Sequence, residues 1–95
     1  MTILILGAGE SGLGSALLAK KNNYNVFISD AGDILDSTKE KLIYSSINFE
    51  ENSHEKAKTL NVDLVIKSPG ISDSSDIVKF LDSKQLKIIS EIEFA

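Results

Sequence analysis

A glycine-rich hexapeptide near the start of the chain, Gly-Ala-Gly-Glu-Ser-Gly at residues 7–12, limits the possible folds more than any other feature. It directly follows the apolar run 2–6, Thr-Ile-Leu-Ile-Leu, which is typical of a parallel strand buried on both faces. After it, from Ser11 to about Asn22, apolar side chains recur at helical spacing before a basic and polar stop. The sequence therefore opens with a strand, a tight glycine turn and a helix.

Each glycine of this turn has its own role in the G-x-G-x-x-G pattern. Gly7 permits the tight turn, Gly9 lets the backbone approach a pyrophosphate, and Gly12 lets the helix pack on the sheet. The N–H groups at the start of the helix would then face the anion. A simpler alternative is that the glycines serve only the strand-to-helix turn.

A second candidate site residue is Asp30, which ends the predicted strand 25–29 about twenty residues beyond the glycine turn. A carboxylate at this position can accept hydrogen bonds from a ribose hydroxyl. The alternative is a turn or helix-capping aspartate, which is common after strands. By themselves, the glycine turn and Asp30 fit an NAD-binding domain.

The rest of the chain continues to alternate strands with helices. We expect a short helix at 39–45, introduced by a capping box from Ser37 to Glu40, and an edge-like strand at 47–50. Further expected elements are a helix at 53–60, a strand at 63–67, a helix with Ile77, Val78, Phe80 and Leu81 on one face, and a strand near 87–90. This order predicts a single α/β domain over residues 1–95, Rossmann-like and three-layered, with a mostly parallel sheet of about five strands and helices on both faces.

The loop Ser68-Pro69-Gly70-Ile71 follows the predicted fourth strand, at the edge of an open α/β sheet where ligands bind. Pro69 fixes φ, Gly70 can expose its N–H closely to a ligand, and Ser68 offers a hydroxyl for a phosphate or nucleoside cradle. As a bare tripeptide, Ser-Pro-Gly is ordinary turn chemistry. The preceding Lys67 would add charge to a pyrophosphate if it turned to the crevice, but a solvated lysine is the favoured interpretation.

Composition excludes several classes of protein. The hydrophobic content of 42% suffices for one modest core, and the net charge of −4 argues against a nucleic-acid surface. There is no cysteine, and the single histidine, His54, lacks the partners of a metal or catalytic cluster, so we expect it on the surface. The apolar run 2–6 is too short to span a membrane and lacks signal-peptide flanks, which predicts a cytoplasmic protein without a membrane partner.

Four segments in a fixed order carry a resemblance. They are the glycine turn 7–12, Asp30, the Ser-Pro-Gly-Ile loop 68–71 and the closing Ser-Glu-Ile-Glu-Phe at 90–94. Together they resemble the Mur ligases of the UDP-N-acetylmuramoylalanine:D-glutamate ligase (MurD) type, over essentially the whole chain. The resemblance implies a Rossmann-like N-terminal domain that binds the UDP moiety of a muramoyl substrate, where the glycine turn alone suggested NAD.

Carried over to this chain, the resemblance implies that Glu10 and Ser11 lie by the nucleotide phosphates. Asp30 and Ala31 would border the uridine, and the 68–71 loop would line the opposite wall. Some members of the family have a threonine and a basic residue after the aspartate, where this chain has Ala31 and Gly32. Side-chain contacts made there in relatives are therefore not transferred.

The resemblance also implies a longer parent enzyme of peptidoglycan synthesis, a process that sets cell shape and division. Central ATP-binding and C-terminal domains would follow residue 95, since residues 1–95 contain no G-x-x-x-x-G-K-[ST] phosphate loop. In the parent, ATP and magnesium would activate the carboxylate of UDP-N-acetylmuramoyl-L-alanine as an acyl phosphate, which the D-glutamate amine attacks. We expect no catalytic residue in this fragment, because Glu10, Glu91 and Glu93 form no acid–base pair. We also expect no metal or cofactor in it, because the resemblance places ATP and magnesium in the other domains.

Two other functions fit parts of the pattern. An NAD-binding or regulatory Rossmann module is supported equally by the glycine turn and Asp30. A domain whose site is vestigial, and whose surface serves only association with other proteins or domains, is the third possibility.

Overall fold

The computed structural model describes residues 1–90 of the 95-residue chain. Strands and helices alternate along this whole length, as the sequence predicts. The strands are β1 (Thr2–Leu6), β2 (Asn25–Ser29), β3 (Asn48–Glu50), β4 (Leu64–Lys67) and β5 (Ile88–Ser90), and the helices are α1 (Glu10–Lys21), α2 (Asp36–Tyr44), α3 (Glu55–Thr59) and α4 (Asp76–Ser83).

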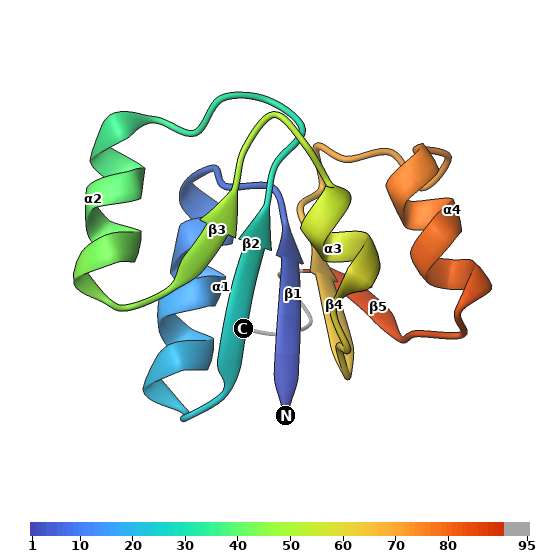
Figure 1. Ribbon diagram of the computed structural model, residues 1–95, viewed down its shortest axis with the longest axis horizontal. Coiled ribbons are helices and arrows are strands. Elements are labelled where there is room, and N and C mark those ends of the chain that lie inside the picture. The colour runs from blue at the N-terminus through green and yellow to red at the C-terminus, as the bar shows by residue number, and fades with distance from the viewer. Residues whose placement is uncertain (91–95) are drawn as a thin grey trace.

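The five strands form one parallel sheet in the order β3-β2-β1-β4-β5 (Figure 1). The chain moves outward from β1 to β2 and β3, then returns past β1 to add β4 and β5 on the other side. β1 and β4 are therefore neighbours whose following loops lead away in opposite directions. Such a switch point leaves a crevice at the carboxyl ends of the strands, and this is where open α/β sheets bind ligands.

Helices cover both faces of the sheet, which confirms the predicted three layers (Figure 1). Alternation along β1 supplies both cores, because Ile3 and Ile5 face one side and Leu4 and Leu6 face the other. On the first side they pack with residues of α1 and α2, and on the second with residues of α3 and α4. All four side chains are 0% exposed, and burial of each contributes about 1.5–3 kcal/mol.

The predicted capping box before the second helix is wrong. Helix α2 begins at Asp36, three residues before the expected start, and its N-cap residue is Leu35, without a side-chain hydrogen bond. Ser37 therefore lies inside the first turn. The buried residues Thr38 and Leu42, four positions apart, place one face of the helix on the core, so packing decides where it starts.

The poorly patterned middle of the chain folds much as predicted. β3 is a three-residue edge strand inside the expected range 47–50, and α3 is shorter than the expected 53–60. The carboxylate of Glu50 accepts hydrogen bonds from the N–H groups of Lys56 and Ala57 at 3.1 and 2.8 Å. This acidic side chain caps the five-residue helix, for which short-range propensity alone is insufficient.

Candidate functional site

Gly7 makes the tight turn that its position after β1 predicts. Its φ of 98° is in the left-handed region that favours glycine, and its N–H donates to the carbonyl of Ser29 at 2.9 Å. A Cβ at this position would lie 3.0 Å from the Cβ of Ser68 and 3.4 Å from Cδ1 of Ile71. The glycine turn and the 68–71 loop are thus in direct contact.

Gly9 and the residues after it form the start of α1. Gly9 is the N-cap residue, and a Cβ built on it would meet no atom within 4 Å, so the backbone is open to an approaching group. Glu10 and Ser11 are exposed in the first turn, where helix N–H groups lack intrahelical partners. Gly12 is buried, as expected for a residue that lets the helix pack closely on the sheet.

Asp30 joins the end of β2 to the glycine turn. One carboxylate oxygen, Oδ2, accepts from the N–H of Ala8 at 2.9 Å, and the other, Oδ1, accepts from the N–H of Gly32 at 2.9 Å. The second bond is the local turn role that the sequence left open as an alternative. The first holds the glycine turn in place, so Asp30 both shapes its own loop and orders the neighbouring one.

The Ser68-Pro69-Gly70-Ile71 loop is held by hydrogen bonds within itself and to β1. The N–H of Ser68 donates to the carbonyl of Leu6 at 3.1 Å, and the N–H of Ile71 donates to the carbonyl of Ser68 at 3.0 Å. The N–H of Gly70 makes a long bond of 3.4 Å to Oγ of Ser68. Pro69 and Gly70 themselves are exposed at the edge of the crevice.

A pocket of about 360 Å³ continues the crevice on the side of α3 and α4. Three of the predicted site residues, Asp30, Ala31 and Ile71, lie in its wall. The remaining lining comes from the start of α3, the β4–α4 loop and the start of α4: His54, Ser72, Ser75, Asp76 and Ile77. We call this the Asp30 pocket. Among the described residues, Ser75 Oγ is a buried side-chain oxygen without a hydrogen-bond partner.

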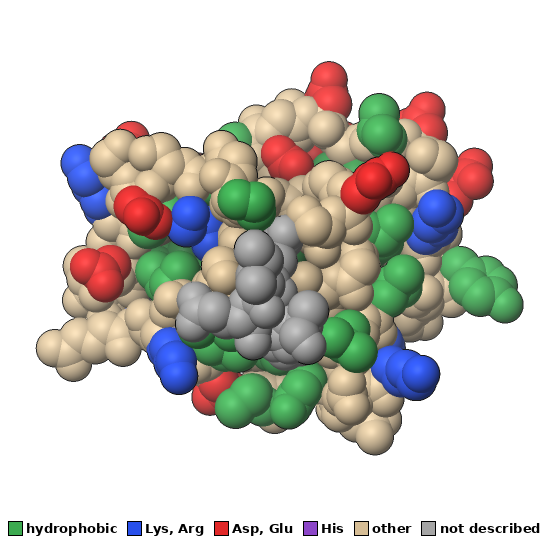
Figure 2. All heavy atoms as spheres, turned by 180° about the vertical axis from the view of Figure 1, so that it is seen from behind, with side chains coloured by type: hydrophobic (Ala, Val, Ile, Leu, Met, Phe, Trp, Pro, Cys, Tyr) green, Lys and Arg blue, Asp and Glu red, His purple; other side chains and the backbone are tan. Residues whose placement is uncertain are grey.

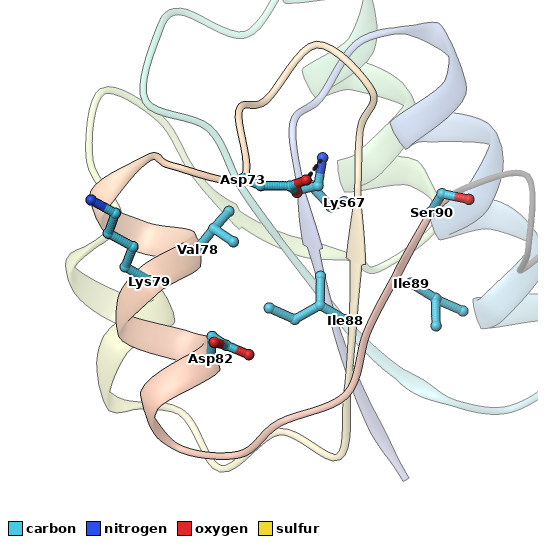
Figure 3. A pocket seen from close by; sticks show the side chains of 8 residues that line it. All are labelled: Lys67, Asp73, Val78, Lys79, Asp82, Ile88, Ile89 and Ser90. Carbon is cyan, nitrogen blue, oxygen red and sulfur yellow. Dashed lines mark ion pairs between the residues drawn. The ribbon is translucent and has the colours of Figure 1, made fainter.

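Lys67 is not the solvated lysine that the sequence favoured. Its side chain is only 16% exposed, and its Nζ donates to the carbonyl of Ile71 at 2.7 Å and pairs with Asp73 at 3.3 Å. Figure 3 shows this ion pair at the edge of a second pocket of about 460 Å³, between α4 and β5. The lysine therefore fastens the loop that follows its strand.

His54 is likewise not a free surface histidine. It is half-buried, and its Nδ1 lies 2.6 Å from Oγ of Ser29, a residue that is 0% exposed. Burial lowers the pKa of the imidazole, against the opposing effect of the nearby carboxylates Glu50 and Asp30. Sequence reasoning missed this contact. The available signal was Ser29 itself, a polar residue directly after the apolar run 26–28, which has to find a buried partner.

Charges are dispersed on the described surface. On the face seen in Figure 2, lysines stand singly among acidic side chains and do not form a continuous basic stripe. Within residues 1–90 no group of three His, Asp or Glu side chains could hold a metal ion.

No helix in the same part of the chain is long and apolar enough to cross a membrane. The predicted Glu91 and Glu93, and the Glu-Ile-Glu-Phe ending, lie outside the described residues.

A parallel sheet of this order, with a glycine turn after its first strand and a crevice at its switch point, defines a Rossmann-like α/β domain. Residues 2–77 match the family model described as the MurD N-terminal domain. The chain belongs to this family, and the predicted resemblance to MurD-type Mur ligases is confirmed.

The similar curated proteins are named as ligases of the MurD type. The UDP-N-acetylmuramoylalanine–D-glutamate ligase of Christiangramia forsetii is 50% identical over 93 residues. The ligases of the same name from Porphyromonas gingivalis and Cytophaga hutchinsonii are 47% and 45% identical. Each comparison covers 98% of this chain and 21% of the relative, so the chain spans about a fifth of these proteins.

Solved structures agree on the fold. A murein peptide ligase (Mpl) from Psychrobacter arcticus superposes with a TM-score of 0.89 at 26% identity, over 99% of this chain and 20% of that one. The UDP-N-acetylmuramate–alanine ligase MurC of Thermotoga maritima gives a TM-score of 0.84 at 21% identity, over 99% of this chain and 21% of that one. The likeness to MurC is evidence for the fold alone.

Proposed function

We propose that this chain is the substrate-binding N-terminal domain of a UDP-N-acetylmuramoyl-L-alanine:D-glutamate ligase, and that it holds the UDP moiety. The observation that carries the proposal is the contact of Gly7 with Ser68 and Ile71, together with the bond from Ala8 to Asp30. Three segments distant in the sequence meet at the switch point of a sheet whose family is that of the MurD N-terminal domain.

The parts of this crevice suit different parts of a nucleotide. N–H groups at the start of α1, around Glu10 and Ser11, are suited to the phosphates, because an open helix N-terminus attracts anions. The open backbone at Gly9 permits close approach, and Gly7 and Gly12 set the turn and the packing of the helix. The uridine would lie against Asp30 and Ala31.

The opposite wall of the proposed site is the loop after β4. Ser68 supplies a hydroxyl, and Gly70 supplies an exposed backbone between Ser68 and Ile71, the two residues that contact Gly7. Pro69 and Ile71 would contribute apolar surface to the ribose or base. Since few of these groups are charged, we expect the site to depend on backbone N–H groups and shape more than on net charge.

The catalytic part of the proposed reaction belongs to the rest of the parent protein. Central and C-terminal domains beyond residue 95 would bind ATP, magnesium and D-glutamate and form the amide bond of a peptidoglycan precursor. Residues 1–95 supply the wall that orients the UDP-sugar, and we expect them to be inactive alone. ATP and the UDP-sugar are both cytoplasmic metabolites, which supports the cytoplasm as the location of the parent protein.

Calorimetric titration of the chain with UDP-N-acetylmuramoyl-L-alanine and, separately, with NAD tests the proposal. We expect saturable binding of the UDP-sugar, weak because one wall of a multidomain site provides few contacts against the entropic cost of association. NAD should bind less tightly. A preference for NAD would overturn the proposal in favour of an NAD-binding or regulatory module.

A further inference from the structure

The Asp30 pocket has room and walls for a flat ring next to the proposed UDP site. It shares Asp30, Ala31 and Ile71 with that site, and Ile77 adds a further apolar side chain. Its volume of about 360 Å³ lies within the usual range of ligand pockets, which combine apolar walls with a few placed polar groups. His54 is such a polar group in the lining of the pocket, and its contact with Ser29 determines which ring nitrogen donates and which accepts.

The hydroxyl of Ser29 lies close to three polar atoms but has only one hydrogen to donate. Its Oγ lies 3.0 Å from Oε2 of Glu50, 3.2 Å from the carbonyl of Ser53 and 2.6 Å from Nδ1 of His54. A carboxylate and a carbonyl can only accept, so the hydroxyl hydrogen must serve one of them. The lone pairs of Ser29 Oγ are then left for His54, and we assign to the ring the tautomer with its hydrogen on Nδ1.

This assignment fixes the state of the other ring nitrogen. In a neutral imidazole with a hydrogen on Nδ1, Nε2 is an acceptor. Nε2 has no hydrogen-bond partner within residues 1–90, and His54 lines the Asp30 pocket. Nε2 is therefore the acceptor that this ring can offer to a group in the pocket, while Nδ1 is held by Ser29, which is in turn bonded to Glu50.

We propose that His54 is a specificity-determining residue for the nucleobase, and that its Nε2 accepts a hydrogen bond from the N3–H of a uracil ring. This assignment rests on the proposed function of the crevice. Uracil has a ring N–H at N3, whereas cytosine has a lone pair there, so one oriented acceptor separates the two bases. A site that hydrogen-bonds one ligand leaves a buried group unpaired with the other.

The charges around His54 set the pH range in which this acceptor exists. Glu50 of β3 and Asp30 after β2 favour protonation, Lys58 of α3 opposes it, and Asp76 of α4 lines the same pocket. Burial has the largest effect and lowers the pKa, so the ring is neutral at neutral pH. Below that pKa, Nε2 carries a hydrogen and faces the N3–H of the base as a second donor, so affinity should fall with falling pH.

Titration of the ¹⁵N-labelled chain by NMR, which measures weak binding, tests the assignment with matched ligands. We expect N3-methyl-UDP and CDP each to bind about tenfold more weakly than UDP at neutral pH, the effect of one lost bond to a partly buried acceptor. Equal affinity for UDP and its N3-methyl derivative would overturn the role of His54. Failure of the wild-type chain to bind UDP would overturn the proposed function and this assignment together.

Two substitutions separate recognition from folding. In His54→Asn the amide can replace Nδ1 as the donor to Ser29 but has no atom at the place of Nε2, so UDP affinity should fall about tenfold. In His54→Gln the amide oxygen reaches the place of Nε2 and does not titrate. UDP affinity should then stay within about threefold of wild type, without the loss between about pH 8 and pH 5.

Both variants are compared by their amide spectra, which report whether the fold is kept. The titrating phosphate of UDP is common to all proteins, so a pH effect that is present in wild type and absent in His54→Gln belongs to the imidazole. Undiminished UDP affinity in a folded His54→Asn, or the same pH profile in wild type and His54→Gln, would refute the assignment.

Discussion

A side chain at position 7 would crowd Ser68, and this single residue connects the fold with the proposed site. The positive φ of Gly7 turns the chain out of β1, and the missing Cβ lets the 68–71 loop approach to contact distance. Gly14 differs from Gly7 in the space around a built Cβ. It is exposed in the middle of α1, and a Cβ there would meet no atom within 4 Å.

Replacing Gly7 by alanine should lower the free energy of unfolding by about 2 kcal/mol, from left-handed backbone strain and the contact with Ser68. Gly14→Ala is the matched control, and it should raise stability by about 0.8 kcal/mol, because alanine is the better helix former. Urea unfolding of both variants measures the two signs. Equal stability of Gly7→Ala and wild type would contradict the turn described here.

At this scale the sequence predicted backbone roles better than side-chain partners. A strand that ends at Gly7 and a helix that begins soon after it predict a tight turn at this glycine. Few other residues adopt the positive φ that such a turn requires. The contacts of Lys67 with Ile71 and Asp73 depend on how a loop folds back, and the contact of His54 with Ser29 joins residues 25 apart. No periodic pattern encodes pairs of that kind.

At the scale of elements, the β4–α4 loop depends on one lysine from the strand before it. Lys67 binds both the carbonyl of Ile71 and the carboxylate of Asp73, so it closes the turn that contains the exposed Pro69 and Gly70. Strands and helices themselves were predictable, because apolar runs and helical periodicity are local patterns. The start of α2 was not, because packing of Thr38 and Leu42 outweighs the capping signal.

Lys67→Met keeps most of the apolar stem and removes the amine. We expect amide hydrogen exchange in residues 70–73 to accelerate about fivefold, with less than about 1 kcal/mol of global destabilisation, because the loop opens locally. Lys79→Met is the control: Lys79 lines the same pocket as Lys67, but its Nζ has no ion-pair or hydrogen-bond partner within residues 1–90. Unchanged exchange in Lys67→Met would show that the lysine does not hold the loop.

At the scale of the whole molecule, the order β3-β2-β1-β4-β5 places the loops after β1, β2 and β4 at one edge of the sheet. Alternating elements and right-handed crossovers predict the parallel sheet and its three layers from the sequence, whereas the strand order comes from the structure. The Asp30 pocket was not, because it needs the starts of α3 and α4 beside the end of β2. The central claim is that this edge, and not the pocket between α4 and β5, receives the UDP moiety.

Mapping UDP-induced shifts of the backbone amides in the ¹⁵N spectrum of the chain tests that claim most directly. The largest shifts should fall on residues 8–11, 30–32 and 70–71, which surround the crevice in three separate segments. Shifts confined to Lys79, Asp82 and Ile88, around the other pocket, would contradict it. So would a spectrum unchanged at millimolar UDP.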